Sequence, residues 1–235
     1  MVKLFIFFYT IFTVKMINSI LYKLFRNHRR GWDPIGEEQL KTYSSNVHLQ
    51  NIDSAQLDNI LKYFVNPKNK KVLDLGAGTG RHTKFFSEIG CQVDWLDVSV
   101  NMLGLAKEYV GDEKKNITFH TKHIEEVDEL TGHYDLIFIR LCWYYCFNDY
   151  SFANKVMSKL DNGGILYLLT NNSKYKYQEV KIHQKIQIFL NQYFNIKIGH
   201  PHPPEGRVRK LFTKKGMKIL YQKLDNDTEE LILKF

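Results

Sequence analysis

One acid and three glycines, in the stretch V-L-D-L-G-A-G-T-G-R, have the residue types and spacing of a ligand-binding turn. An apolar run ends at Asp74, and Gly76, Gly78 and Gly80 follow at alternate positions before a helical pattern begins. Glycines let the backbone turn sharply and approach a ligand closely, because no Cβ stands in the way. A Gly-rich turn between a strand and a helix is the ligand-binding corner of a Rossmann-like sheet. The dinucleotide fingerprint G-x-G-x-x-G would need a glycine where Arg81 stands, so the spacing D-x-G-x-G-x-G indicates a different ligand.

Further motifs follow this turn in order along the chain. A second apolar run ends at Asp97, 17 residues after Gly80, and an acid there can accept two hydrogen bonds from the hydroxyls of a ribose. The later motifs are a Ser-x-x-Met-Leu run, a fourth strand pattern and a Gly-Gly turn before a fifth strand, at Ser99 to Leu103, 134–139 and 163–168. Taken together, these motifs resemble those of class I S-adenosylmethionine (SAM)-dependent methyltransferases. The resemblance covers residues 60–170, and 204–235 more weakly.

The resemblance implies a set of cofactor contacts. Asp74 would help to hold the methionine ammonium of SAM, the glycine loop would pass beneath the cofactor, and Asp97 would bind the ribose, with Val98 and Met102 beside the adenine. The sequence departs from the family at the adenine edge, because His123 stands where an aspartate is frequent. Adenine would then be recognised by His123 or by the backbone around Ile124, and a solvated loop histidine is the alternative. The full predicted cofactor set is Asp74, Gly76, Ala77, Gly78, Gly80, Asp97, Val98, Met102, His123, Ile124 and Arg140.

The residues after the fourth strand bear on the methyl acceptor. The Asn/Asp-Pro-Pro-Tyr/Phe motif of enzymes that methylate an amino group of a base is absent here, as is the Pro-Cys nucleophile of cytosine C5 enzymes. DNA bases are therefore not the expected acceptor. Arg140, Tyr144 and Tyr145 are expected to line the transfer pocket, although each could equally be a core residue.

No general base stands out in the sequence. Tyr144 and His183 are the candidate catalytic residues, because a phenol lies near the expected pocket and a histidine can deprotonate a hydroxyl near neutral pH. His200 and His202 are further histidines of the same region. No third ligand accompanies these two at a metal-binding spacing, so no metal is expected.

Charge is unevenly distributed along the 235 residues, whose net charge is +8. Residues 171–223 hold 12 Lys or Arg and two Asp or Glu, and residues 1–30 hold six Lys or Arg and no acid. Such a field favours an anionic acceptor, for example a glycan, a lipid-linked intermediate or another metabolite, although a solvated basic face is the alternative. A methyltransferase acting on RNA and a module that binds SAM without catalysis are the rival functions. The lack of an RNA-binding module disfavours nucleic acid.

Residues 1–30 form an apolar and basic N-terminal arm. The apolar stretch 4–25 has the length of a membrane span, but Lys15 lies in its middle, where a charge is costly. Three interpretations remain: an anchor at the cytoplasmic face of a membrane, a helix packed on the domain, or residues without function upstream of a start at Met16. Three cysteines are too few for a disulfide framework and fit a reducing, cytoplasmic compartment.

The alternation of strand and helix patterns predicts the fold class, an α/β, doubly wound, mostly parallel seven-stranded sheet. The pattern of residues 217–224 and 229–235 predicts a C-terminal antiparallel hairpin. One methyltransferase domain is expected over 31–235, with a cap insertion at 171–205 that follows strand five on the ligand-binding edge of the sheet. Trp32 and Tyr43, which precede the first strand, are candidates for a lid over the cofactor.

Overall fold

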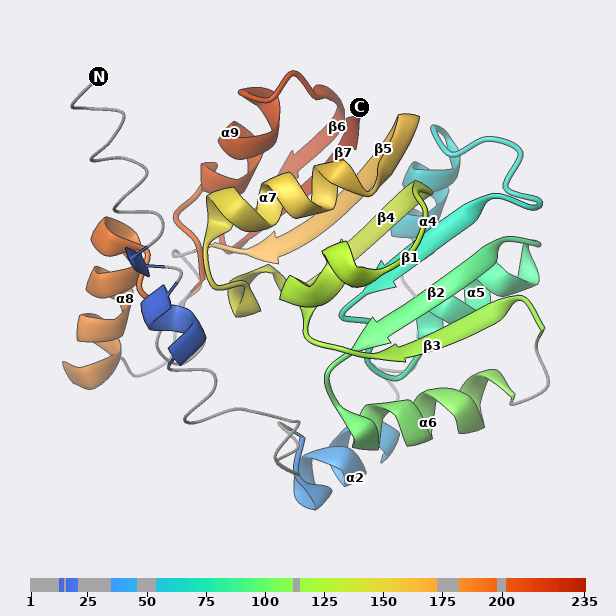
Figure 1. The fold of residues 1–235 in the computed structure, drawn as a ribbon, viewed down its shortest axis with the longest axis horizontal. Coiled ribbons are helices and arrows are strands. Elements are labelled where there is room, and N and C mark those ends of the chain that lie inside the picture. Colours follow the sequence, from blue (N-terminus) through green and yellow to red (C-terminus); the bar gives the residue numbers. More distant parts are fainter. Residues whose placement is uncertain are drawn as a thin grey trace.

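Seven strands form one mixed sheet in the order β3-β2-β1-β4-β5-β7-β6 (Figure 1). The computed structural model describes residues 13, 14, 16–20, 35–45, 54–111, 115–172, 182–197 and 202–235. Strands β1 to β5 pair in parallel with one another, whereas β7 runs antiparallel to both β5 and β6. The predicted fold class and its C-terminal hairpin are confirmed. The strands are β1 Lys71–Leu75, β2 Gln92–Asp97, β3 Ile117–Thr121, β4 Tyr134–Arg140, β5 Leu160–Asn171, β6 Lys218–Leu224 and β7 Thr228–Lys234.

Both faces of the sheet are buried, as a doubly wound fold requires. Successive side chains of a strand point to opposite faces, and β4 shows the consequence. Leu136 and Phe138 pack with Phe86 on one face, while Ile137 and Ile139 pack with Phe152 on the other. The strands therefore read as continuous apolar runs rather than alternating ones.

Helices cover the two faces of the sheet. The core on one side includes residues of α4 (Ser54–Leu61) and α5 (Arg81–Glu88), and the other side includes residues of α7 (Asp149–Ser158) and α9 (Arg207–Thr213). Helix α2 precedes α4 and contacts α6 at the β2–β3 end of the sheet (Figure 1). The remaining elements are α2 Glu37–Ser45, α6 Val100–Val110, α8 Ile182–Phe194 and the short 3-10 helices η2 Ile124–Glu129 and η3 Trp143–Tyr145.

The Gly-Gly pair lies inside a strand rather than before it. Strand β5 already begins at Leu160, which pairs with Tyr134, and the register to β4 shifts before Ile165 pairs with Leu136. Gly163 has φ +77°, a value that L side chains rarely adopt. The glycines therefore allow an irregularity within the strand, which is why a sequence pattern reads them as a turn.

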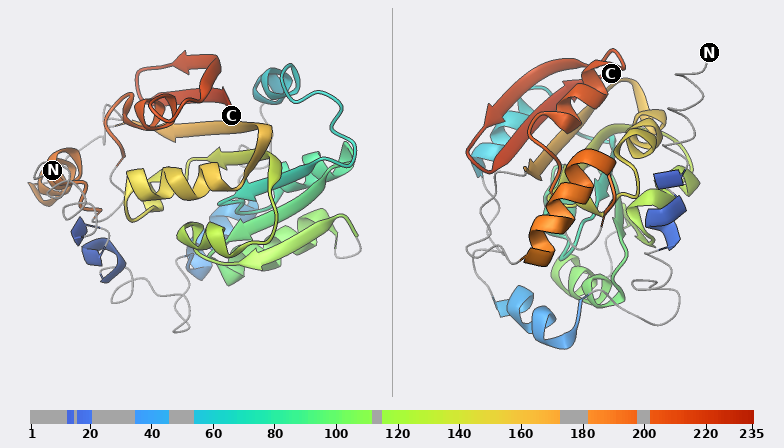
Figure 2. Two further views of the ribbon diagram at one scale, coloured as in Figure 1. Left: turned by 45° about the horizontal axis from the view of Figure 1, so that its top comes forward. Right: turned by 90° about the vertical axis from the view of Figure 1, so that its left-hand side faces the viewer.

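The predicted cap and part of the N-terminal arm meet at one end of the molecule. Residues 16–20 are helical and lie at the same end of the molecule as α8, as Figures 1 and 2 show. Asn18 is buried: its Nδ2 donates to the carbonyl of Asn195 at 3.1 Å, and its Oδ1 accepts from the backbone N–H of Lys197 at 2.9 Å. These contacts favour the interpretation of a helix packed on the domain. Within the described ranges, no helix combines the length and apolar character needed to cross a membrane.

Candidate cofactor and acceptor site

The three glycines of the loop after β1 differ in what surrounds them. All three have positive φ, +73° at Gly76, +53° at Gly78 and +77° at Gly80. A Cβ on Gly76 would lie 2.6 Å from Sγ of Cys142, and one on Gly80 would lie 3.0 Å from Cβ of Ala106. A Cβ on Gly78 would meet nothing within 4 Å among the described residues. Gly76 and Gly80 thus serve packing, and Gly78 leaves open space where a cofactor can approach the backbone.

Strand β2 fixes the conformation of this loop. The indole Nε1 of Trp95 donates to the carbonyl of Gly78 at 3.1 Å, and the backbone N–H of Gly78 donates to Oδ2 of Asp97 at 2.9 Å. The other oxygen of Asp97 accepts from the N–H of Ser99 at 3.0 Å. A carboxylate offers about four lone-pair sites, so Asp97 retains capacity for ribose hydroxyls while it holds the loop.

Asp74 is buried below the loop, where the nearby positive charge only partly offsets the cost of burying its carboxylate. Its Oδ2 accepts a hydrogen bond of 2.6 Å from the hydroxyl of Thr83. Burial raises the pKa of Asp74 to about 7, although Thr83 and the positive charge of Arg140 act in the opposite direction. An ammonium group close to this carboxyl would favour its ionised form, so the site fits the methionine ammonium of SAM.

The guanidinium group of Arg140 lies near Asp74, and that of Arg81 lies near Arg140. Nε of Arg140 is buried and has no hydrogen-bond partner within the described part of the chain. Burial and the charge of Arg140 lower the pKa of Arg81, and burial together with both arginines lowers the pKa of His82 to about 3. This concentration of positive charge fits a carboxylate such as that of the methionine moiety. Sequence reasoning missed Arg81, although its position directly after the last glycine was a usable signal.

His123 is held tightly by its own segment. Its Nδ1 accepts from the backbone N–H of Glu125 at 3.2 Å, and its backbone N–H donates to Oε2 of Glu126 at 2.7 Å. The ring stacks on Phe147 at a centroid distance of 4.7 Å. His123 is 5% exposed, so the alternative of a solvated loop histidine is wrong. Its predicted contact with adenine stays a prediction, as does that of its buried neighbour Ile124.

The remaining predicted cofactor residues lie around the loop and the end of β2. Met102, whose backbone N–H donates to Oγ of Ser99, is buried in a cluster with Trp95. Ala77 packs against the same cluster, and Val98 is half-buried. Tyr43 of α2 also packs against this cluster, so the segment that precedes β1 reaches the glycine loop. Trp32, the other lid candidate, lies outside the described residues.

Three segments distant in sequence meet at Tyr144. Its ring lies 4.6 Å from that of Tyr145 and 5.0 Å from that of His202, edge to face with the latter. Burial raises the pKa of Tyr144, and the neighbouring Tyr145, Cys142 and Tyr43 raise it further. Because Cys142 also touches Gly76, this aromatic group borders the glycine loop. Residues of α2, of the segment after β4 and of the predicted cap are therefore close to one another beside the glycine loop.

The histidines of the cap are placed differently from one another. His183 is exposed on α8, and no recorded contact of the described residues joins it to Tyr144. His202 contacts Tyr144 directly, whereas His200 lies outside the described residues. The described residues contain no group of three or more His, Cys, Asp or Glu that could hold a metal ion.

A buried ion cluster, missed by sequence reasoning, fixes the cap to the core. Oδ1 of Asp149 accepts from Nζ of Lys197 at 2.7 Å and from the indole of Trp143 at 3.0 Å, and Oδ2 pairs with Arg207 at 3.3 Å. Burial acts to raise the pKa of Asp149, but Lys197 and Arg207 outweigh it and hold the pKa below its usual value. The same pairing raises the pKa of Lys197 against the effect of burial.

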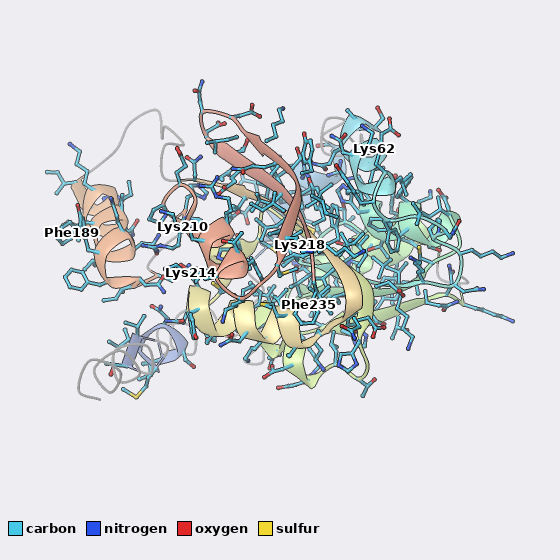
Figure 3. The ribbon with its side chains drawn as sticks, turned by 90° about the horizontal axis from the view of Figure 1, so that it is seen from above. Lys62, Phe189, Lys210, Lys214, Lys218 and Phe235 are labelled. Atoms are coloured by element: carbon cyan, nitrogen blue, oxygen red, sulfur yellow. The ribbon has the colours of Figure 1, made fainter. Side chains whose placement is uncertain are left out.

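A basic groove of about 480 Å³ opens between α8 and α9. Arg207, Lys210 and Lys214 line it, with Glu205 as the one acid of the lining. Figure 3 shows Lys210 and Lys214 on the side of α9 that faces α8. The groove reaches Pro204, two residues beyond His202, but it includes none of the predicted cofactor residues.

Comparison with known proteins identifies relatives of this architecture. A family model described as a methyltransferase domain matches residues 72–164. An uncharacterized methyltransferase of Schizosaccharomyces pombe is 21% identical over 128 residues, which are 53% of this chain and 88% of the relative. The N-terminal Xaa-Pro-Lys N-methyltransferase 1 of Mus musculus is 32% identical over 100 residues, 40% of this chain and 45% of the relative. In fold, the chain is similar to a SAM-dependent methyltransferase of Aquifex aeolicus, with a TM-score of 0.58, 15% identity and coverage of 84% and 97% of the two chains.

Proposed function

Residues 72–164 are the methyltransferase domain of a class I, Rossmann-like, SAM-dependent enzyme, and from this premise we propose that the chain methylates an oxygen or nitrogen atom of a small or medium-sized anionic acceptor. SAM supplies a methyl group that its sulfonium already activates, so the protein must chiefly position the acceptor and, where needed, remove a proton. The N-methyltransferase name of the mouse relative is compatible with a nitrogen acceptor, and oxygen remains an equal choice.

Residues in and around the glycine loop would each bind a different part of the cofactor. Asp74 would hold the ammonium, Arg140 and Arg81 the carboxylate, and Asp97 the ribose. Each assignment follows from charge: a buried acid of raised pKa favours a cation, and two adjacent guanidinium groups favour an anion. The open space above Gly78 leaves room for the cofactor to lie against the backbone.

Tyr144 would position the acceptor rather than deprotonate it. Its raised pKa keeps the phenol protonated at neutral pH, so it can donate a hydrogen bond but is a poor base. His202, which contacts Tyr144, is placed better than the exposed His183 to take up a proton. Tyr43 would close the same pocket from the side of α2.

The basic groove is the observation that supports an anionic acceptor. Three cations and one acid line a cavity of about 480 Å³, and the cavity reaches the segment that brings His202 to Tyr144. Because Arg207 is already paired with Asp149, an acceptor would place its charged part beside Lys210 and Lys214 and its reacting atom near Tyr144. Such a field also raises the local concentration of anions.

A tritiated-methyl screen tests this proposal. Cell extract is separated on an anion exchanger into retained metabolites, unretained metabolites and RNA, and each fraction is incubated with labelled SAM and the full chain. We expect label in the retained metabolites. Lys210→Glu/Lys214→Glu should reduce that labelling by about tenfold or more, whereas the control Lys62→Glu/Lys218→Glu, with both lysines away from the groove in Figure 3, should not. Label confined to RNA would support the rival function, and label in the unretained fraction would contradict an anionic acceptor.

A further inference from the structure

Helix α8 turns its apolar side chains away from the protein. Asn191, which is 1% exposed, faces inward, where its Nδ2 donates to the carbonyl of His202 at 2.9 Å. Arg207 donates to the carbonyls of Asn191 and Gln192 at 3.2 and 2.7 Å. Polar contacts therefore determine which side of α8 meets the core, and they leave the opposite side outward.

The outward side carries a continuous apolar stripe, formed by Ile182, Ile186, Phe189 and Tyr193. These side chains are 78%, 54%, 53% and 67% exposed, and their spacing of four, three and four residues places them on one face of the helix. The stripe is about 16 Å long at 1.5 Å per residue. Large apolar side chains gathered in one exposed row mark an interaction surface, whereas single ones do not. In Figure 3, Phe189 points outward at the far end of the molecule from Lys62.

The N-terminal segment adds apolar side chains at the same end. Met16 and Ile20 are 48% and 46% exposed, while Asn18 between them is held against Asn195 and Lys197 just after α8. Figures 1 and 2 show both helical segments at the same end of the molecule. Exposed apolar side chains of two elements therefore gather at this end, and polar contacts join the N-terminal segment to the residues just after α8.

The segment that carries the stripe is positively charged. Helix α8 contains Lys185 and no acidic residue, and residues 171–223 hold 12 Lys or Arg and two Asp or Glu. An apolar helix face within a basic segment is the pattern of helices that lie in the interface of an anionic membrane. Acidic lipids attract basic residues over the whole face that meets the membrane. A protein surface of mixed charge would attract them less uniformly.

We propose that α8, with its apolar stripe and the basic segment that carries it, docks this protein on the surface of an anionic lipid bilayer. The helix lies in the interface and does not cross the membrane. Since α8 stands near the carboxyl ends of β4 and β5, docking would turn the acceptor pocket toward the bilayer (Figure 1). The proposal does not depend on the identity of the acceptor, because vesicle binding requires neither acceptor nor SAM.

Vesicle flotation of the full chain provides the test, with vesicles of phosphatidylcholine alone and with about 30% phosphatidylglycerol. We expect partition into the anionic vesicles that weakens as salt increases. Ile186→Glu/Phe189→Glu should lower this partition by about tenfold or more, because two glutamates would replace the centre of the stripe. The matched control is Val65→Glu/Phe235→Glu, whose native side chains are 56% and 46% exposed on other elements and should not matter.

Several outcomes would overturn the proposal. Binding to anionic vesicles that survives the α8 substitutions, or that the control substitutions reduce equally, would contradict it. Equal binding of the wild type to neutral and anionic vesicles, or no binding to either, would contradict it as well. A dimer in light scattering that the α8 substitutions dissociate would assign the stripe to a second copy of the chain instead. Unchanged binding of S-adenosylhomocysteine by each variant shows that it is folded, and this readout also separates failure of the docking proposal from failure of the methyltransferase proposal.

Discussion

The hydroxyl of Thr83 donates a hydrogen bond of 2.6 Å to the buried carboxyl of Asp74, nine residues earlier in the chain. This contact joins the first turn of α5 to the end of β1 across the glycine loop. It also favours the charged form of a carboxyl whose burial disfavours that form. The pair thus sets the protonation of the group predicted to hold the cofactor's ammonium.

Asp74→Asn is expected to weaken cofactor binding and to stabilise the ligand-free protein at pH 8. The folded-state pKa of Asp74, about 7, lies above the ordinary value of 3.8, so the folded protein binds a proton that the unfolded chain has lost between these two values. The wild-type stability should therefore fall as pH rises from about 4 to 7, and the amide should remove that dependence. Thermal unfolding with and without S-adenosylhomocysteine measures both effects. A variant that is less stable at pH 8, or that binds as tightly as the wild type, would contradict this account of Asp74.

Alanine at Gly76 and at Gly78 should have different consequences. Gly78→Ala costs about 1–2 kcal/mol from the left-handed backbone but meets open space, so the fold should persist while affinity for S-adenosylhomocysteine falls. Gly76→Ala adds a methyl group 2.6 Å from the Cys142 sulfur and should destabilise the fold considerably more. Denaturant unfolding and calorimetric titration separate the two effects. Equal stability losses in the two variants would show that the surroundings of the loop do not distinguish the glycines as described.

Tyr144→Phe should lower kcat/KM without moving the pH dependence of the reaction. The pKa of Tyr144 is raised by burial, so the phenol stays neutral over the working range and its loss removes a hydrogen bond rather than a titrating group. A pH profile of methyl transfer checks this, with Tyr221→Phe as the control because Tyr221 lies on the edge strand β6. Disappearance of an inflection in the Tyr144 variant would instead identify this residue as the base.

Asp149→Asn should destabilise the protein by about 3–5 kcal/mol, because it leaves the buried Lys197 without its carboxylate. The low folded-state pKa of Asp149 implies a contribution to the stability of the protein. This contribution is complete above the unfolded-state pKa of 3.8 and is lost as pH falls through the lower folded-state pKa. The raised pKa of Lys197 implies a second contribution to stability, which is complete below pH 10.5 and is lost as pH rises through the folded-state pKa. Urea unfolding across pH measures these changes. For comparison, Lys223→Met removes the exposed pair with Asp225 and should leave the free energy of unfolding almost unchanged.

The sheet could be predicted from the sequence because its signals are local. Apolar strands, glycines at turns and helical spacing each depend on residues within a few positions, and they sufficed for the succession of strands and helices along the chain and for the ends of β1 and β2. The buried cluster at Asp149 could not be predicted in this way, since its partners Lys197 and Arg207 lie 48 and 58 residues away. The meeting of Tyr43, Tyr144 and His202 has the same origin: tertiary packing, and not spacing, brings them together.

The bond from Trp95 to Gly78 gives the protein an optical reporter of its own active centre. An indole whose N–H bonds to a loop carbonyl changes its emission when that bond lengthens or the surrounding polarity changes. Trp95 is fully buried beside the loop, so a cofactor that lies above Gly78, as we propose, would disturb this fluorophore through one hydrogen bond. Cofactor occupancy can therefore be followed in unlabelled protein, and Trp95→Phe identifies the share of the signal that comes from this position.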